Sequence, residues 1–221
     1  MPRISRLLPE TGVFHILTRG NNRQKTFEDQ KDYKYYLYLL KFYKEEHRFR
    51  LYHYCLMPNH VHLILETTPE TNLSKLMKQI NLAYMYHFRK RYHYWGHFWQ
   101  GRFKSLLIDK DEYLITCGRY VESNPVRAKM VQNPGDYPWS SYRVYAQGAV
   151  DGLVDIDPLY EDLSKSPKER QKIYRDSIEQ TQRINFNLRF LGSRSFINRM
   201  EEQFGVKNLR NRRGRPFKVN K

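Results

Sequence analysis

The sequence has only two cysteines, Cys55 and Cys117, and they do not form a Cys-x-x-Cys pair. We therefore expect neither a disulfide framework nor a cysteine-based zinc site, and a reducing, cytoplasmic setting is the default. Long apolar runs are absent as well, because none approaches the roughly 20 residues of a membrane-spanning helix. No apolar segment follows the first six residues, as a secretory leader would require, so we expect no membrane partner.

Acidic residues are scarce relative to basic ones. The 221 residues include 39 Lys and Arg but only 23 Asp and Glu, which gives a formal net charge of +16 and a pI of about 9.8. That excess is too large for an ordinary enzyme that acts on a small neutral substrate. It favours a polyanionic partner, above all a nucleic acid, and the expected location is the cytoplasm in association with the nucleoid.

Hydrophobic periodicity is strong over the first 145 residues, and an aromatic content of 15% excludes a chain without a folded core. Short apolar runs that end at turn residues predict strands, and apolar residues three and four apart predict helices. The predicted order is β-α-β-β-α-β followed by one more helix, which is the split βαβ, ferredoxin-like arrangement of the α+β class. The predicted strands cover residues 14–18, 51–57, 61–65 and 104–108, and the predicted helices cover 29–48, about 72–88 and about 109–123.

The rest of the chain has a different composition. Residues 133–158 are rich in Pro, Gly and Asp, which predicts a closing loop and a linker. Ser166-Pro167 is typical of a helix start and predicts a polar helix over 168–182, and one more helix is predicted around 196–204. We therefore predict three parts: a main domain over 1–150, a helical extension over 151–205 and a basic tail over 206–221.

His60 and His62 lie in a segment, residues 57–66, that has the pattern of a strand. Side chains alternate along a strand, so both imidazoles point to one face, about 7 Å apart, where they could hold one divalent cation. A half-buried strand that happens to carry two polar residues explains the same pattern. Two ligands do not complete a site, and Cys55 is the only sulfur nearby. An open site with oxygen ligands and waters would suit Mg²⁺ or Mn²⁺ serving a phosphate.

Tyr120 and Asn124 lie four residues apart in a segment that predicts a helix, so they share a face. A phenol oxygen and an amide ligand could thus be presented together, next to a cation that polarises a phosphate. A phenol is a weak nucleophile at neutral pH without such help. Alternatively, Tyr120 is one of 18 tyrosines and packs at the edge of the core beside Leu114 and Val121, while Asn124-Pro125 caps a following short helix.

Residues 71–108 contain no Asp or Glu, but seven Lys or Arg, nine Phe, Tyr or Trp and three His. Basic side chains pair with phosphates and aromatic rings stack on unpaired bases, so this segment is a candidate surface for single-stranded or hairpin DNA. Arg102 and Lys104 are predicted phosphate contacts, because their strand would lie beside the His pair. Trp95 and Trp99 are equally suited to stacking on bases and to packing in the core.

The basic tail contains Arg213 and Arg215 within an Arg-Gly-Arg-Pro sequence. This sequence looks like the core of an AT-hook, which enters a narrow A·T minor groove where the negative potential attracts Arg. A basic tail that adds only non-specific, salt-sensitive affinity is the other interpretation.

Five segments, taken together and in order, carry a resemblance to a known family. They are Thr18–Asn21, Leu56–Leu65, Gly101–Ser105, Arg119–Ala128 and Trp139–Tyr142. The second of these resembles the metal-binding His-hydrophobic-His strand of the HUH superfamily. The whole set resembles the REP-associated tyrosine transposases, which are domesticated relatives of the single-tyrosine insertion-sequence transposases. The resemblance is dense over residues 10–145.

The resemblance implies a ferredoxin-like HUH nuclease domain over 1–150 with an added catalytic helix. It implies that His60, His62 and Asn124 hold Mg²⁺ or Mn²⁺ and that Tyr120 attacks a phosphodiester of single-stranded DNA. The products would be a 5′-phosphotyrosine and a free 3′-OH, without ATP. The substrates would be repetitive extragenic palindromes, which are imperfect hairpins with a short tetranucleotide on the 5′ side.

Three further residues in these motifs are candidate DNA contacts. Arg19 and Asn21 lie in the loop after the first strand, and Arg127 lies just beyond Asn124. Two other functions stay open: a catalytically silent DNA or RNA hairpin-binding protein derived from a transposase, and a metal-dependent hydrolase that uses an activated water. The oligomeric state, monomer or homodimer, also stays open, although one catalytic tyrosine per chain suggests that a complete transposition needs two active sites.

Overall fold

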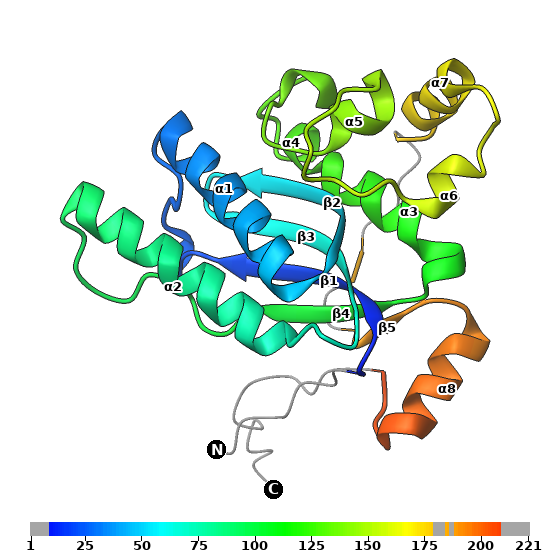
Figure 1. The fold of residues 1–221 in the computed structure, drawn as a ribbon, viewed down its shortest axis with the longest axis horizontal. Coiled ribbons are helices and arrows are strands. Elements are labelled where there is room, and N and C mark those ends of the chain that lie inside the picture. Colours follow the sequence, from blue (N-terminus) through cyan, green and yellow to red (C-terminus); the bar gives the residue numbers. More distant parts are fainter. Residues whose placement is uncertain (1–8, 179–183, 186–187, 209–221) are drawn as a thin grey trace, which may run out of the picture.

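The computed structural model describes residues 9–178, 184–185 and 188–208 and centres on one five-stranded sheet (Figure 1). The strand order is β2-β3-β1-β4-β5, in which β1 to β4 pair antiparallel and the short β5 runs parallel to β4. The order of the first four strands is that of the ferredoxin-like arrangement, so the predicted α+β fold is confirmed. The strands are β1 (Gly12–Arg19), β2 (Arg50–Met57), β3 (His60–Thr67), β4 (Lys104–Ile108) and β5 (Phe190–Leu191).

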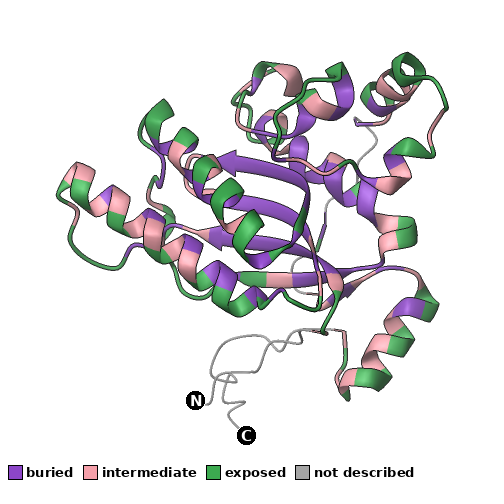
Figure 2. Cartoon of the chain, in the orientation of Figure 1, coloured by how far each residue is buried: buried purple, intermediate pink, exposed green. Residues whose placement is uncertain are grey.

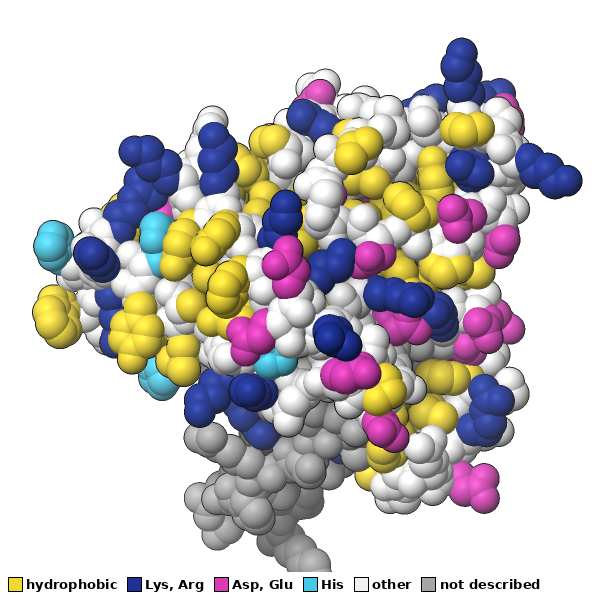
Figure 3. Space-filling model, viewed as in Figure 1, with side chains coloured by type: hydrophobic (Ala, Val, Ile, Leu, Met, Phe, Trp, Pro, Cys, Tyr) yellow, Lys and Arg dark blue, Asp and Glu magenta, His cyan; other side chains and the backbone are white. Residues whose placement is uncertain are grey.

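Two long helices, α1 (Gln30–His47) and α2 (Leu73–Tyr92), cover one face of the sheet (Figure 1). The side chains of Asp29 and Asn72 accept hydrogen bonds from backbone amides in the first turns of α1 and α2. Buried positions concentrate on the sheet and on the inner sides of these helices (Figure 2). Their outer sides expose hydrophobic side chains beside Lys and Arg (Figure 3), and the rings of Tyr38, Phe42 and Tyr86 are more than half exposed.

The opposite face of the sheet is covered by α3 (Lys110–Glu122), which α4 (Asn124–Arg127) follows directly. Val13 and Phe14 are neighbours in β1 and therefore point to opposite faces. Phe14 packs with α1 and α2, whereas Val13 lies in a cluster with apolar residues of α3. The extra helix predicted between Asp109 and Ser123 is confirmed, and it places the segment with Tyr120 over the sheet.

Residues 133–158 are not the loop and linker that their composition predicts. They contain η2 (Pro134–Asp136) and α5 (Tyr142–Gln147), and the chain returns along the outer edge of β2 before α6 (Pro158–Glu161). The hydroxyl of Tyr145 donates to the carbonyl of Tyr52 at 2.8 Å, and that of Tyr137 donates to the carbonyl of Leu56 at 2.6 Å. Buried tyrosines with bonded hydroxyls therefore attach this segment to β2, and the prediction was wrong because Pro and Gly there mark turns between packed pieces.

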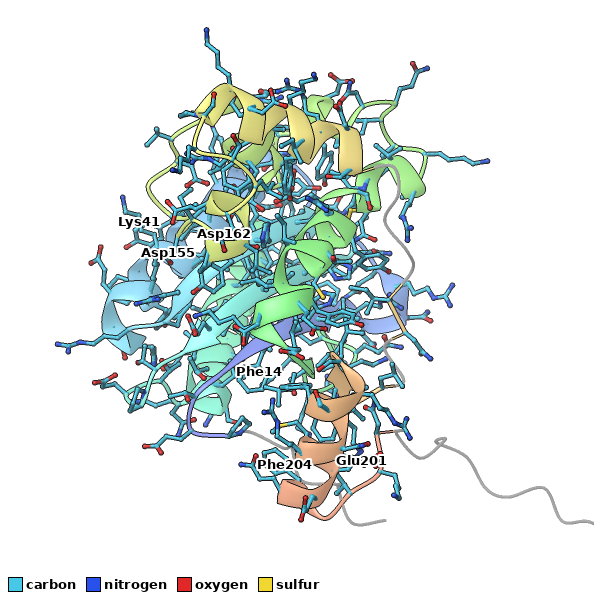
Figure 4. All side chains as sticks on the ribbon, turned by 90° about the vertical axis from the view of Figure 1, so that its right-hand side faces the viewer. Phe14, Lys41, Asp155, Asp162, Glu201 and Phe204 are labelled. Atoms are coloured by element: carbon cyan, nitrogen blue, oxygen red, sulfur yellow. The ribbon has the colours of Figure 1, made fainter. Side chains whose placement is uncertain are left out.

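The last elements pack at two separate places. Helix α7 (Pro167–Ser177) begins at Ser166-Pro167 as predicted and lies on α5, with the rings of Tyr145 and Tyr174 at 5.3 Å between centroids. Helix α8 (Arg194–Phe204) confirms the helix predicted around 196–204. Figure 4 shows Asp162, at the end of α6, in the upper half of the view and Glu201 and Phe204 on α8 at the bottom. The remainder of the predicted 168–182 helix lies largely outside the described residues, and the boundary at residue 150 stays a prediction.

Among the described residues, no helix combines the length and the apolar character that crossing a membrane requires.

Candidate active site and metal centre

The two histidines of the motif lie at the start of β3 and on the face that α3 covers. Cross-strand pairing places His60 between Met57 of β2 and Arg19 of β1, and His62 between Cys55 and Leu17. The rings of His60 and His62 are 4.9 Å apart between centroids at an interplanar angle of 77°. His60 is half-buried and His62 is only 3% exposed. The two imidazoles thus face one small region at the end of the sheet, as the strand alternation predicts.

Each of these imidazoles has its Nδ1 atom engaged. His60 Nδ1 lies 2.5 Å from Oδ1 of Asn59, and His62 Nδ1 lies 2.8 Å from Nε2 of His15. His15 is in β1 and is 1% exposed. In proteins, an imidazole that binds a metal through one nitrogen commonly has the other nitrogen hydrogen-bonded, which sets the orientation of the ring. No local pattern in the sequence points to His15, because only the β1–β3 register brings it to His62.

Burial keeps these histidines neutral in the folded chain. It lowers the pKa of His15 to about 3, and burial together with the positive charge of Arg19 lowers the pKa of His60 to about 4. The pKa of His62 is also well below its ordinary value, through burial and its neighbours His15, His60 and Arg19. Neutral imidazole is the form that binds cations. The protonation state of His60 and His62 and the hydrogen bonds at their Nδ1 atoms therefore both suit the binding of a divalent cation.

Tyr120 lies on α3 and packs in one cluster with the residues of β2 that pair with His60 and His62. It is 7% exposed and belongs to the same apolar cluster as Met57 and Cys55, the residues that pair with His60 and His62 across β2 and β3. The guanidinium carbon of Arg127 lies 4.9 Å from the centroid of the Tyr120 ring. Positive charge is therefore held directly against the candidate nucleophile.

Asn124 is the first residue of α4, and Ser123 precedes that helix, so Asn124 is not its cap. The side-chain Nδ2 of Asn124 donates to the carbonyl of Val121 at 3.0 Å, which fixes the amide group at the joint between α3 and α4. An amide oxygen is a suitable ligand for Mg²⁺ or Mn²⁺. In the described part of the chain, no three His, Cys, Asp or Glu side chains form a ready-made metal site. A cation at the His pair would therefore depend on amide, phosphate or water oxygens for its other ligands.

A second polar cluster, fully buried, lies beside the end of α3. His53, Glu122 and Asp157 are all 0% exposed, and His53 donates to Glu122 at 2.9 Å and to Asp157 at 3.1 Å. Burial alone would lower the pKa of His53, but the hydrogen bonds to Asp157 and Glu122 outweigh it and raise the pKa to about 9. The imidazolium of His53 therefore links β2 to α3 and to the cap of α6.

Glu122 has further partners in this cluster. The hydroxyl of Ser141 donates to it at 2.5 Å and the hydroxyl of Tyr174 donates to it at 2.7 Å. A Cβ on Gly118, one turn earlier in α3, would lie 2.4 Å from ring atoms of His53, so only glycine lets the ring approach the helix this closely. Glu122 lies within one of the sequence motifs, but its role could not be read from them, because its partners His53, Ser141 and Tyr174 come from three distant segments.

The predicted DNA contacts on the first strand and on β4 lie near the His pair. Arg19 is directly opposite His60, and Lys104 pairs with Leu17 in the same row across the sheet as His62. Arg102 is exposed just before β4. Asn21 begins η1 (Asn21–Arg23), and its backbone amide donates to the carbonyl of Phe98 at 2.7 Å. These four positions surround one end of the sheet.

The two tryptophans have different environments. Trp95 is 89% exposed in the loop between α2 and β4. Trp99 is half-buried, its indole nitrogen donates to the carbonyl of Asn81 at 2.9 Å, and its ring packs on Phe98. Stacking on DNA stays a prediction for both, but only Trp95 presents most of its ring to solvent. Arg213 and Arg215 lie outside the described residues.

Two solved structures are similar to this chain. A search of solved structures found a REP-associated tyrosine transposase bound to a REP hairpin, with a TM-score of 0.56 and 19% identity, over 71% of this chain and 95% of that chain. At this identity the likeness shows a shared fold. A putative transposase from Deinococcus radiodurans has a TM-score of 0.39 and 17% identity, over 60% of this chain and 94% of that chain. No curated protein matches the chain.

The segment that matches a known family contains both the His pair and the segment with Tyr120 and Asn124. The description of the matching family is "Transposase IS200 like", and the match spans residues 10–124, more than half of the 221 residues. That span begins just before β1 and contains His60, His62, Tyr120 and Asn124. The chain therefore belongs to the IS200-like transposase family.

Proposed function

We propose that the chain is a metal-dependent endonuclease and strand transferase that cuts single-stranded DNA at REP-type palindromic hairpins through a 5′-phosphotyrosine. The observation that carries the proposal is the position of Tyr120: it lies on α3, packed on the same sheet face as His60 and His62. Membership of the IS200-like transposase family supports DNA strand chemistry. The solved relative that is bound to a REP hairpin supports the choice of hairpin DNA as substrate.

The reaction is a transesterification. The phenol oxygen of Tyr120 forms a bond to the phosphorus, and the bond from phosphorus to the 3′ oxygen breaks. The phenol proton is released and the leaving 3′ oxygen gains a proton, so the number of phosphoester bonds is unchanged and no ATP is needed. A free 3′-OH can later attack the phosphotyrosine, which joins strands and restores Tyr120. Arg127, 4.9 Å from the ring centroid, places positive charge beside the tyrosine that would attack the anionic phosphate.

A divalent cation held by His60, His62 and the amide oxygen of Asn124 would polarise the scissile phosphate and offset the charge that develops on it. The protein's part is to orient these groups. Asn59 fixes the ring of His60, His15 contacts the ring of His62, and the joint between α3 and α4 fixes Asn124.

The charges around the end of the sheet account for DNA binding. Arg19 and Lys104 lie in the rows of His60 and His62, and Arg102 is exposed beside them, so all three are suited to phosphate contacts. The exposed ring of Trp95 is suited to stacking on an unpaired base, which is worth about 1–3 kcal/mol. A hairpin with a single-stranded flank offers both kinds of contact.

The test is cleavage of a labelled single-stranded REP-type hairpin by the full chain, with Mg²⁺, Mn²⁺ or EDTA present. The variants are Tyr120→Phe and, as a matched control on the same helix, Tyr113→Phe. We expect a cation-dependent cut and a covalent protein–DNA adduct for wild type and Tyr113→Phe, and binding without either for Tyr120→Phe. Tight binding without a cut by wild type would favour a silent hairpin-binding protein. A cut by Tyr120→Phe without an adduct would instead favour an activated water.

A further inference from the structure

We propose that His15 is a positioning residue that fixes the tautomer of His62, so that His62 carries its proton on Nδ1 and its lone pair on Nε2. The proposal rests on the metal site of the proposed function, and extends it to a residue outside the motifs. His15 belongs to a different strand and touches the site only through His62. Its role is to set which nitrogen of His62 can bind a cation.

The contact between the two rings is short and buried. His15 Nε2 lies 2.8 Å from His62 Nδ1, the ring centroids are 5.1 Å apart, and the side chains are 1% and 3% exposed. Between two neutral imidazoles one nitrogen must donate and the other accept. If His62 donates from Nδ1, its lone pair is on Nε2 and the ring can bind a cation there. If His15 donates, the proton of His62 is on Nε2 and that nitrogen cannot be a ligand.

The neighbouring histidine shows how this chain sets a tautomer. Nδ2 of Asn59 donates to the carbonyl of Arg23 at 3.1 Å, so Oδ1 of the same amide faces His60. A carbonyl oxygen only accepts, and His60 must therefore donate from Nδ1 and carry its lone pair on Nε2. Binding of one cation by both rings through equivalent atoms requires the same tautomer at His62. At His62, the group that contacts the corresponding nitrogen, Nδ1, is His15.

The position of His15 is set by the centre of the sheet. β1 lies between β3 and β4, and His15 pairs with Ile64 on one side and Leu106 on the other. His62 pairs with Leu17, which lies two residues after His15 in β1. His15 is therefore the diagonal neighbour of His62 on the same face of the sheet. Ile64 and Leu106 are apolar and buried, and an imidazole among them loses its hydration. A valine or isoleucine would pack there without that cost, so the imidazole is explained by its bond to His62.

The test uses the full-length protein without DNA and has two readouts. The first is the ¹⁵N NMR shifts of the His62 ring nitrogens in the metal-free protein at neutral pH, which report the tautomer. The second is the Kd for Mn²⁺, from the EPR signal of the free ion. The variants are His15→Phe, which keeps a ring but removes the acceptor, and His15→Gln, which restores an acceptor. The matched control is His47→Phe, because His47 is also buried and bonded, to Gln79 at 2.6 Å, but lies on α1.

We expect the Nδ1–H tautomer of His62 in wild type and in His47→Phe. His15→Phe should lose that preference and raise the Kd for Mn²⁺ about 10–100-fold, as loss of an outer hydrogen bond to a ligand does. His15→Gln should recover part of both. An Nε2–H tautomer in wild type would overturn the proposal, and so would a folded His15→Phe with the wild-type Kd.

The failure of this proposal is distinguishable from failure of the metal site itself. His60→Ala and His62→Ala should each abolish tight Mn²⁺ binding. If both variants bind Mn²⁺ as wild type does, the metal part of the proposed function is wrong, and the tautomer of His62 in metal-free protein still decides whether His15 sets it. If His15→Phe does not fold, the wild-type tautomer and the His15→Gln variant decide the matter.

Discussion

Glu122 is the acceptor around which the buried cluster beside Tyr120 is built, so Glu122→Gln tests that cluster directly. Its carboxylate accepts hydrogen bonds from His53, Ser141 and Tyr174. Glutamine has only one acceptor oxygen. Its NH₂ group would place hydrogen-bond donors opposite groups that now donate to Glu122. His53 would also lose one of the two charges that hold its proton, in a place where Glu122, His53 and Asp157 are 0% exposed.

The expected cost follows from this burial. Removing one partner of a buried ion pair costs about 3–5 kcal/mol. The hydroxyls of Ser141 and Tyr174 can turn to accept from the new amide, which limits the loss, so we expect the free energy of unfolding to fall by about 3 kcal/mol. The assay is urea unfolding of the full chain at pH 7, with the exposed Glu45→Gln as a matched control that should stay within about 0.5 kcal/mol. A loss below about 1 kcal/mol for Glu122→Gln would refute the charged pair with His53.

Three other predictions concern the same cluster and the DNA surface. His53 has its pKa raised from 6.5 to about 9 on folding, so its stabilisation is complete below pH 6.5 and is lost as pH rises through 9. Urea unfolding should show a fall of about 3 kcal/mol from this residue, at about 1.4 kcal/mol per unit, and a smaller fall in Glu122→Gln. Gly118→Ala should lower the Tm. Its Cβ would lie 2.4 Å from ring atoms of His53, and that steric clash costs more than the roughly 1 kcal/mol gained in helix propensity. Trp95→Ala should weaken hairpin binding by about 1–3 kcal/mol in a gel-shift assay without changing the Tm, whereas Tyr86→Ala should change neither.

Each of these has a clear opposing result. A stability profile that is flat from pH 6.5 to 9, or that rises, would mean that His53 is neutral in the folded chain. A Tm for Gly118→Ala at or above that of wild type would mean that α3 can move away from His53. Equal affinities of wild type and Trp95→Ala for the hairpin would remove Trp95 from the DNA surface.

Much of the architecture was predictable from the sequence because the deciding patterns are local. Alternation in residues 57–66 was enough to place His60 and His62 on one face, and Pro58-Asn59 marked the turn between β2 and β3. The spacing of Tyr120 and Asn124 likewise predicted one helical segment, although Ser123 divides it into α3 and α4. These features depend on neighbours within a few residues.

What the sequence did not reveal depends on pairing between distant segments. The contact of His15 with His62 follows from the β1–β3 register, which no local pattern specifies. The cluster of His53, Glu122 and Asp157 gathers residues from β2, α3 and the start of α6, and each alone resembles an ordinary polar residue. The two-residue strand β5 is too short to give a pattern at all.

The segment that returns along β2 also determines how this chain can associate with another. An edge strand with unpaired amide and carbonyl groups is a template for a strand of a second molecule. Here the amide of Leu56 donates to the carbonyl of Trp139, and the carbonyl of Leu56 accepts from the hydroxyl of Tyr137. The carbonyl of Tyr54 accepts from the amide of Ser141. Strand exchange or sheet extension through β2 would first have to displace these groups. Two copies acting together on one DNA would therefore not be joined by strand pairing along this part of β2.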